Sequence, residues 1–278
     1  MKKVKVGFQG VSGSFSEEAL FLYFKENFET VTVPEFEDIF KGIINNDFDY
    51  GILPLENSST GAITHVYDLL NQNEVYIIGE TFLKVKHHLL ALPQADIEDI
   101  KEVYSHPQGF EQSRPFLKMY PSWKLIPHYN TAKSAELVMK TQNKTMAAIA
   151  SLRAAELYGL NILREGINTN SSNTTRFITL GKNLTFEEQS NKVSIVLATK
   201  HTAGSLYKVL KNFAENSINM LKIESRPIPD RPWEYFFYVD FEGNLEDGKI
   251  LKTIDRIKED SEYFKMLGNY KKAEELAR

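Results

Sequence analysis

The chain has 278 residues, with 33 lysines and arginines against 37 aspartates and glutamates, and it contains no cysteine. The formal net charge of -4 gives no basic footprint for nucleic acid, and the missing cysteine excludes disulfides, thiolate catalysis and cysteine-ligated zinc. With 42% hydrophobic residues, the chain can form one large or two ordinary domains with real cores.

Short apolar runs alternate with helical periodicity in the first part of the chain. The strand expected at 4–8 is too short and too interrupted for a signal peptide or a membrane span, so we expect a cytoplasmic protein. After it come expected helices at 16–28, 36–45 and 65–72 and expected strands at 31–33, 50–55 and 75–81. This βαβα pattern predicts a parallel sheet with helices on its faces.

The segment 85–92 is expected to cross into a second lobe spanning about 81–160. Its expected strands are 102–105, 124–127 and 146–150, and its expected helices are 110–119, 132–141 and 151–158. Segments 161–163 and 176–180 would return the chain to the first lobe, about 1–80 plus 161–183. Two α/β lobes joined by two crossings leave a cleft, and ligands bind such sheets at the carboxyl ends of strands.

A polar run at 187–191 predicts a domain boundary. Beyond it, we expect strands at 193–199, 218–227, 235–241 and 263–267, and helices at 204–216 and 245–259. The order βαββαβ is the ferredoxin-like arrangement. We expect a small separate domain over 192–272 that takes no part in the cleft.

Among the histidines, only His87 and His88 are neighbours, and adjacent residues of a strand point to opposite faces, so we expect no metal. Three loops that follow strands carry hydrogen-bonding side chains. Gly13 and Ser14 precede a helix whose free N–H groups favour an anion, and a plain glycine turn with an N-cap serine is the equal alternative. Residues 56–61 supply several hydrogen-bond donors and one carboxylate, which favours a ligand site. The alternative is an ordinary solvated loop. In the opposite lobe, His106 either titrates or serves as a structural hydrogen-bonding group.

The run 173–177 places a hydroxyl beside a guanidinium. Thr175 can donate or accept a hydrogen bond, and Arg176 offers a rigid fork that matches a carboxylate and stays charged near neutral pH. Phe177 adds an aromatic wall. The run therefore suits a small organic anion, although an isolated arginine more often pairs with a structural acid.

These segments, in this order, resemble the prephenate dehydratase family. The motifs are GxxGSFS at 10–16, ENSSTGAI at 56–63, SHPQ at 105–108, AAIAS at 147–151 and NTTRF at 173–177. The C-terminal part resembles the regulatory ACT domain of the family through ESRP at 224–227 and LGNY at 267–270. The resemblance implies an α/β, two-lobed, periplasmic-binding-protein-like catalytic domain over 1–183, followed by a ferredoxin-like ACT domain.

The resemblance further implies a carbon–oxygen lyase that converts prephenate to phenylpyruvate in L-phenylalanine biosynthesis, without a cofactor. Thr175 would act on the leaving hydroxyl, Arg176 would fix a carboxylate and Phe177 would shape the site. A neutral hydroxyl is a poor acid, so Thr175 is expected to hydrogen-bond or relay a proton, with Glu56 as a candidate proton source if burial raises its pKa. Asn57 completes the predicted catalytic set. The predicted substrate contacts are Gly13, Ser14, Ser58, Thr60, Gly61, Ser105, His106, Gln112 and Asn173.

An ACT domain implies that phenylalanine binds between two such domains in a homodimer or homotetramer and inhibits the enzyme. Glu224 and Arg226 offer opposite charges for the two ends of an amino acid. The helix start TAGSL at 202–206 departs from the usual PGAL of the family, which leaves the strength of binding and the exact ligand open. The predicted phenylalanine contacts are Gly204, Ser205, Leu206, Glu224, Ser225, Arg226 and Pro227.

Before the first strand there is no segment that could serve as a chorismate mutase, so we expect a monofunctional enzyme. Two alternatives stay open: an arogenate dehydratase, and a non-catalytic two-lobed amino-acid sensor. The intact pair Thr175 and Arg176 argues against the sensor, and also against a prephenate decarboxylase that keeps the hydroxyl.

Overall fold

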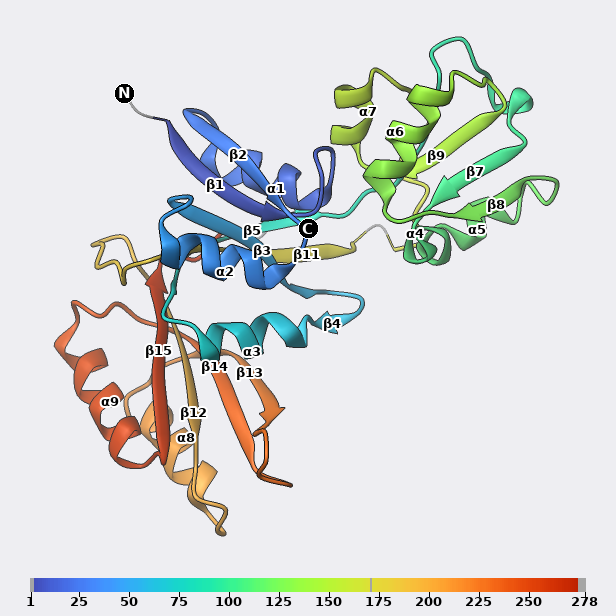
Figure 1. The fold of residues 1–278 in the computed structure, drawn as a ribbon. Helices are drawn as coiled ribbons and strands as arrows, with labels where there is room; N and C mark the ends of the chain where they lie inside the picture. Colours follow the sequence, from blue (N-terminus) through green and yellow to red (C-terminus); the bar gives the residue numbers. More distant parts are fainter. Residues whose placement is uncertain (1–2, 171, 275–278) are drawn as a thin grey trace.

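The computed structural model describes residues 3–170 and 172–274. The first lobe contains the strands that end at the predicted cleft (Figure 1). Its strands are β1 (Val4–Gln9), β2 (Phe28–Val33), β3 (Tyr50–Asn57), the two-residue β4 (Gly61–Ala62), β5 (Tyr76–Lys84) and β11 (Thr174–Gly181). Strand β1 runs parallel to β2 and β3, whereas β11 runs antiparallel between β3 and β5.

Apolar residues alternate along these strands and create a core on each face of the sheet. Helix α1 (Phe15–Phe24) covers the face that carries Phe8, Ile52 and Phe177. Helices α2 (Phe36–Asn45) and α3 (Thr64–Gln72) cover the other face, which carries Leu53 and Ile178. Consecutive residues of β11 therefore serve different faces of the sheet, and this alternation decides which of its side chains reach the cleft.

The second lobe has its own five-stranded sheet, in the order β10-β6-β9-β7-β8. Its strands are β6 (His88–Ala91), β7 (Glu102–Ser105), β8 (Lys124–Pro127), β9 (Met146–Ala150) and β10 (Asn161–Arg164). Its helices are the 3-10 turn η1 (Ile97–Asp99), α4 (Pro107–Gln112), α5 (Arg114–Leu117), α6 (Thr131–Thr141) and α7 (Leu152–Tyr158). A separate core that includes Val103, Ala135 and Ile149 holds these elements together.

The C-terminal unit follows the order βαββαβ. It consists of β12 (Lys192–Ala198), α8 (Ser205–Glu215), β13 (Met220–Pro227), β14 (Tyr235–Glu242), α9 (Gly248–Glu259) and β15 (Tyr263–Tyr270). Helices α8 and α9 pack on one face of its sheet around Val209, Phe213 and Ile254. Tyr238 and Leu267, from the opposite face, join the core that α3 covers.

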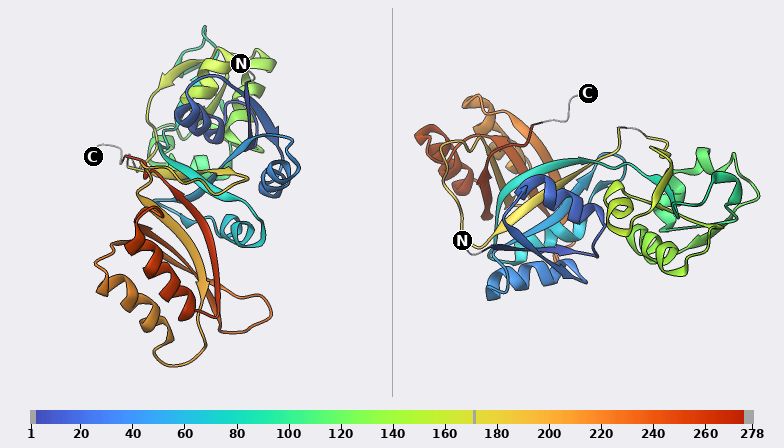
Figure 2. Two further views of the ribbon diagram at one scale, coloured as in Figure 1. Left: turned by 90° about the vertical axis from the view of Figure 1, so that its left-hand side faces the viewer. Right: turned by 90° about the horizontal axis from the view of Figure 1, so that it is seen from above.

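The C-terminal unit has its own core and is also joined to the first lobe. Strand β15 pairs with β5 at Gly268 and Ile77, so one ten-stranded sheet runs through the first lobe and the C-terminal unit. A Cβ on Gly268 would lie 2.2 Å from the carbonyl oxygen of Ile77, which explains why a glycine stands at this close approach. Figure 2 shows the first lobe between the second lobe and the C-terminal unit.

Three expected segments differ most from the structure. Helix α1 ends at Phe24 rather than at residue 28, because Lys25 and Asn27 adopt left-handed backbone conformations and residues 28–33 form β2 beside β1. The helix expected at 110–119 begins earlier, with Pro107 in its first turn, and is interrupted at Ser113. Segment 161–163 pairs with β6, so it belongs to the second lobe and the return crossing comes after it.

Across residues 3–170 and 172–274, no helix combines the length and the apolar character needed to cross a membrane.

Candidate active site

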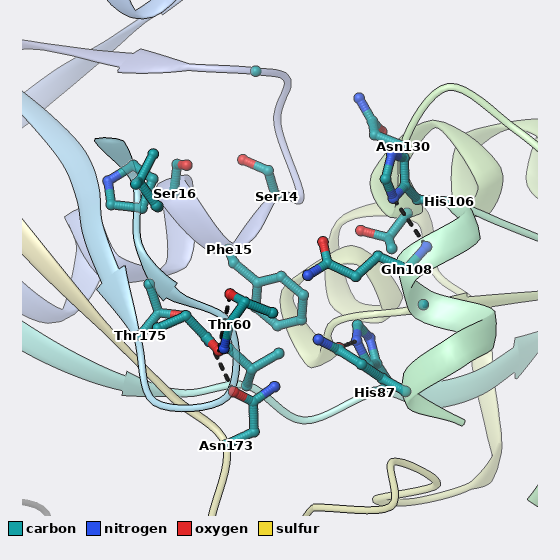
Figure 3. Close-up of a pocket in the computed structure, with 18 of the residues that line it drawn as sticks. Ser14, Phe15, Ser16, Thr60, His87, His106, Gln108, Asn130, Asn173 and Thr175 are labelled. Carbon is teal, nitrogen blue, oxygen red and sulfur yellow. Dashed lines mark hydrogen bonds between the residues drawn. The ribbon is translucent and has the colours of Figure 1, made fainter. Parts of the chain in front are cut away.

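The first lobe and the second lobe enclose a cavity of about 590 Å³. Figure 3 shows Ser14, Phe15 and Thr175 on one side and His106, Gln108 and Asn130 on the other. The described residues that line it are Gln9, Gly10, Ser14, Phe15, Ser16, Pro54, Asn57, Thr60, Ile63, Val85, His87, His106, Gln108, Gly109, Gln112, Tyr129, Asn130, Thr131, Asn173, Thr175 and Phe177. The cavity lies where strands of both lobes end, as the sheet topology predicts.

Three helices begin at the wall of this cavity. Their N-cap residues are Ser14 for α1, His106 for α4 and Asn130 for α6, and each side chain accepts a hydrogen bond from a backbone N–H of its own helix. The first turn of a helix has N–H groups that no carbonyl of the helix can satisfy, and it carries partial positive charge. The starts of α1 and α6 therefore bring partial positive charge to a wall whose described lining holds no lysine or arginine.

Hydrogen bonds fix the orientation of Asn57 beneath the cavity. Its Oδ1 accepts hydrogen bonds from the backbone N–H groups of Ser59 at 2.9 Å and Thr60 at 3.1 Å. Its Nδ2 must therefore face the other way, where it donates to Thr175 Oγ1 and to Asn173 Oδ1, both at 2.8 Å. Because Thr175 accepts from Asn57, its own hydroxyl hydrogen is free to point elsewhere.

His87 lies at the crossing between the two lobes. Its ring packs edge-on against Phe15 at a centroid distance of 5.5 Å, and its Nε2 lies 2.7 Å from Oε1 of Gln112 in the second lobe. Burial lowers the pKa of the His87 imidazole, so the ring is neutral near pH 7. With Nε2–H donating to Gln112, Nδ1 is an acceptor without a partner among the described residues.

No lysine, arginine, aspartate or glutamate stands among the described residues that line the cavity. The walls offer amides, hydroxyls, two histidines and backbone N–H groups. In the described part of the chain, no group of three or more histidine, aspartate and glutamate side chains is arranged to hold a metal ion.

The cavity brings together predicted residues from all four loops. These are Ser14, Asn57, Thr60, His106, Gln112, Asn173, Thr175 and Phe177. They lie in both lobes and up to 163 positions apart in the chain (177 minus 14), so the fold assembles the polar loops as expected.

Four other predicted contacts lie outside the lining. Gly13 packs against α7, where its carbonyl accepts a 2.8 Å hydrogen bond from Ser151 Oγ. Ser58 is an exposed residue of the loop between β3 and β4, and Gly61 is the exposed first residue of β4. Ser105 is fully buried and donates to the carbonyl of Ile149. These residues lie next to the cavity and do not line it, and their contact with a substrate stays a prediction.

Arg176 and Glu56 are the main corrections. Arg176 points to the face of the sheet opposite Thr175 and is 3% exposed. Its guanidinium contacts Glu80 at 2.7 Å, Asp240 at 2.7 Å and Glu56 at 3.4 Å. The predicted carboxylate clamp and the predicted proton source are thus partners in an ionic cluster outside the cavity, because adjacent residues of a strand alternate between faces.

The residues predicted to bind phenylalanine divide into two groups. Gly204, Ser205 and Leu206 line a second cavity of about 440 Å³ together with residues of β14. Residues 224–227 do not line it: Glu224 pairs with Lys222, and Arg226 makes two hydrogen bonds to Asp68. Within one chain, the predicted opposite charges of Glu224 and Arg226 are therefore already neutralised.

Several residues that line the cavity are not among the predicted substrate contacts. Asn130 and Thr131 follow β8 and stand at the start of α6. They are therefore polar residues at the end of a loop that follows a strand and precedes a helix, which is the kind of loop expected to reach the cavity. His87 was considered only as a metal ligand. No local sequence pattern indicates that a residue at the crossing between the lobes lines the cavity. Phe15 and Ser16 stand inside the motif at 10–16, Gln9 directly precedes it, and all three line the cavity.

Comparisons with known proteins agree with this architecture. The family model described as prephenate dehydratase matches residues 6–185. The bifunctional chorismate mutase/prephenate dehydratase of Buchnera aphidicola subsp. Acyrthosiphon pisum (strain APS) is 35% identical over 268 residues, which cover 95% of this chain and 70% of that protein.

Two solved structures resemble the whole chain. The prephenate dehydratase from Arthrobacter aurescens in complex with L-Phe has a TM-score of 0.86 and 26% identity, and the match covers 96% of this chain and 90% of that one. GqqA, described as a novel type of quorum quenching acylase, has a TM-score of 0.88 and 27% identity, with 99% of this chain and 100% of that one covered.

Proposed function

The chain belongs to the prephenate dehydratase family, and we propose that the cavity between its lobes is where prephenate becomes phenylpyruvate. In this reaction the bond to the ring carboxylate breaks, its electron pair enters the ring, and the ring hydroxyl leaves from the opposite carbon. The products are carbon dioxide, water and phenylpyruvate. One proton must reach the departing oxygen, because hydroxide is a poor leaving group.

The orientation of Thr175 is the observation that carries this proposal. Since Asn57 donates to its Oγ1, the hydroxyl of Thr175 can donate to the leaving oxygen of the substrate. A positioned donor of this kind contributes about 10²–10⁴-fold in rate. Thr175 is a weak acid, so a titratable group must replace its proton, and His106 on the opposite wall of the cavity (Figure 3) is the candidate.

Prephenate carries two negative charges, and the described lining holds no cationic side chain to match them. The starts of α1 and α6, with N-caps Ser14 and Asn130, supply partial positive charge instead, each worth about 0.3–1 kcal/mol at an exposed site and up to about 2 kcal/mol when partly buried. A neutral site has a chemical advantage here. An ion pair with the ring carboxylate would stabilise the ground state, whereas the reaction requires this group to lose its charge as carbon dioxide.

The lining also favours prephenate over arogenate. Arogenate has an ammonium group where prephenate has a keto group, and no aspartate or glutamate in the described lining could pair with it. Comparing kcat/KM for the two substrates tests the proposal, with phenylpyruvate followed by its absorbance in alkali. We expect prephenate to be preferred by about tenfold or more, which corresponds to about 1.4 kcal/mol. Absence of product from both substrates would contradict the proposed function.

We further propose that residues 192–272 form an ACT domain that binds phenylalanine in a homodimer or a larger homo-oligomer. The βαββαβ order, the cavity at Gly204 and Leu206, and the L-Phe complex of the Arthrobacter relative support this. Because residues 224–227 line no part of that cavity in one chain, a second chain would have to bring such residues to the ligand. Titration calorimetry with phenylalanine tests this proposal, and the absence of binding heat would contradict it.

A further inference from the structure

The strands that carry Asn57 and Thr175 carry a second pair of residues, Glu56 and Arg176, on their opposite face. In the β3–β11 ladder, Thr175 pairs with Asn57 and Arg176 pairs with Glu56. The first pair faces the cavity, and the second pair faces the C-terminal unit. A displacement of Arg176 or Glu56 therefore moves the backbone that positions the Asn57–Thr175 hydrogen bond.

Arg176 is held by groups from three different strands. Its Nε donates to Glu80 on β5 at 2.7 Å, its Nη1 donates to Asp240 on β14 at 2.7 Å, and its Nη2 donates to the Tyr270 hydroxyl on β15 at 3.0 Å. Burial alone would raise the pKa of Asp240, but the charges of Arg176 and Lys192 outweigh it and hold that pKa below its ordinary value. Arg176 and Asp240 are therefore both charged at neutral pH.

Further contacts close the cluster, one from Lys192 to the first lobe and two from Ser194 inside the C-terminal unit. Lys192 contacts Glu80 at 2.9 Å, and Ser194 donates to Asp240 at 2.6 Å and lies 2.8 Å from the Tyr270 hydroxyl. Lys192, Asp240 and Tyr270 are each at most 8% exposed. Buried charges are tolerated when each is paired, so displacement of one strand of the C-terminal unit changes all of these contacts together.

Glu56 has its own contact with the C-terminal unit, a short ion pair with Lys222 on β13. Lys222 also lies 3.4 Å from Glu224 and is 20% exposed at its side chain. Both residues behind the Asn57–Thr175 pair are thus attached to the same C-terminal sheet, Glu56 through β13 and Arg176 through β14 and β15.

We propose that Arg176 and Glu56 are positioning residues, which rests on the proposed function of the cavity. They couple the geometry of the Asn57–Thr175 pair to the C-terminal unit, and their partners Asp240 and Lys222 transmit changes in that unit to turnover. Arg176 itself does not touch the substrate. The predicted signature is an effect on kcat rather than on KM, because the Asn57–Thr175 pair shifts while the other residues that line the cavity stay in place.

Lys222→Met tests this coupling and leaves every residue of the catalytic lobes intact. Lys265→Met is its matched control, because Lys265 is also a C-terminal cation that contacts the first lobe. Its Nζ donates to the carbonyls of Leu70, Asn71 and Asn73 at the end of α3, away from β3 and β11. Lys222→Arg keeps the cation beside Glu56 and serves as the rescue.

We expect Lys222→Met to lower kcat about tenfold with KM changed less than about twofold, and Lys222→Arg to recover most of that loss. Lys265→Met should leave kcat within about twofold of the wild type. Equal kcat values for Lys222→Met and Lys265→Met would overturn the coupling.

Amide hydrogen exchange provides a readout that needs no turnover. We expect faster exchange in β3 and β11 of Lys222→Met than in the same strands of Lys265→Met. If the wild type does not convert prephenate, the proposed function fails, and the exchange comparison still decides the coupling. The same exchange in both variants would overturn it.

Discussion

Asn57 donates a 2.8 Å hydrogen bond from Nδ2 to Oγ1 of Thr175, across the pair of strands that forms the floor of the cavity. The direction of this bond is determined by the backbone, because Oδ1 of Asn57 accepts the N–H groups of Ser59 and Thr60. A threonine whose oxygen is occupied as an acceptor presents its hydrogen to the substrate. The local loop after β3 thus determines the chemistry available at β11.

Replacing Asn57 with aspartate should reverse this hydrogen bond. A carboxylate only accepts, so the Thr175 hydroxyl would donate to Asp rather than to the substrate, and a negative charge would stand beside a dianion. We expect Asn57→Asp to lower kcat by about 10²–10³-fold and to raise KM. Steady-state kinetics at several pH values check this. Protonation of the new carboxyl at low pH should restore part of kcat, and a kcat equal to that of the wild type would contradict the orientation of Thr175.

The contact between α1 and α7 should make stability depend on pH. Burial, together with repulsion from Glu156, raises the pKa of Glu18 from 4.5 to about 7. Because the folded protein holds this proton more tightly than the unfolded chain, stability falls as the pH rises from about 4.5 to about 7, by at most about 3 kcal/mol.

Unfolding temperatures measured between pH 5 and pH 8 for the wild type and Glu18→Gln test this dependence. The variant lacks the titrating group, so its unfolding temperature should fall less over this range. Glu156→Gln should also reduce the slope, because it removes the repulsion on Glu18. Identical slopes for all three proteins would contradict the assignment.

The sequence predicted the order of elements and the loops of the cavity because both depend on local signals. Polar residues that follow a buried strand and precede a helix mark the carboxyl ends of strands, and Asn57 and His106 were found in this way. The end of α1 could not be predicted from such local sequence signals. Its end depends on the left-handed backbone of Lys25 and Asn27 and on pairing of the next residues with β1.

The role of Arg176 was misjudged because its partners are distant in the sequence. Glu80 lies 96 residues away and Asp240 lies 64 residues away, and no local pattern shows that they meet. Two signals were nevertheless present. Adjacent residues of a strand point to opposite faces, so Thr175 and Arg176 could not share one site, and Glu80 is a charged residue in the middle of a largely apolar strand.

Gly268→Ala should destabilise the junction of β15 and β5. The added Cβ would lie 2.2 Å from the carbonyl oxygen of Ile77, and a backbone atom cannot move aside as a flexible side chain can. We expect a loss of about 1–3 kcal/mol in the free energy of unfolding, measured by chemical denaturation. Gly248→Ala is the matched control, because no atom lies within 4 Å of its added Cβ, and it should be neutral or stabilising by up to about 1 kcal/mol. Equal stability of the two variants would contradict the close approach.

The most direct test of the account is kcat/KM for prephenate in Thr175→Val, with Thr175→Ser as its control. Valine keeps the shape of the side chain and removes the hydroxyl, whereas serine keeps the hydroxyl at the position that Asn57 contacts. We predict a loss of about 10²–10⁴-fold in Thr175→Val and a loss of less than about tenfold in Thr175→Ser. A valine variant that turns over prephenate at a near-normal rate would contradict the central claim that the Thr175 hydroxyl assists departure of the ring oxygen.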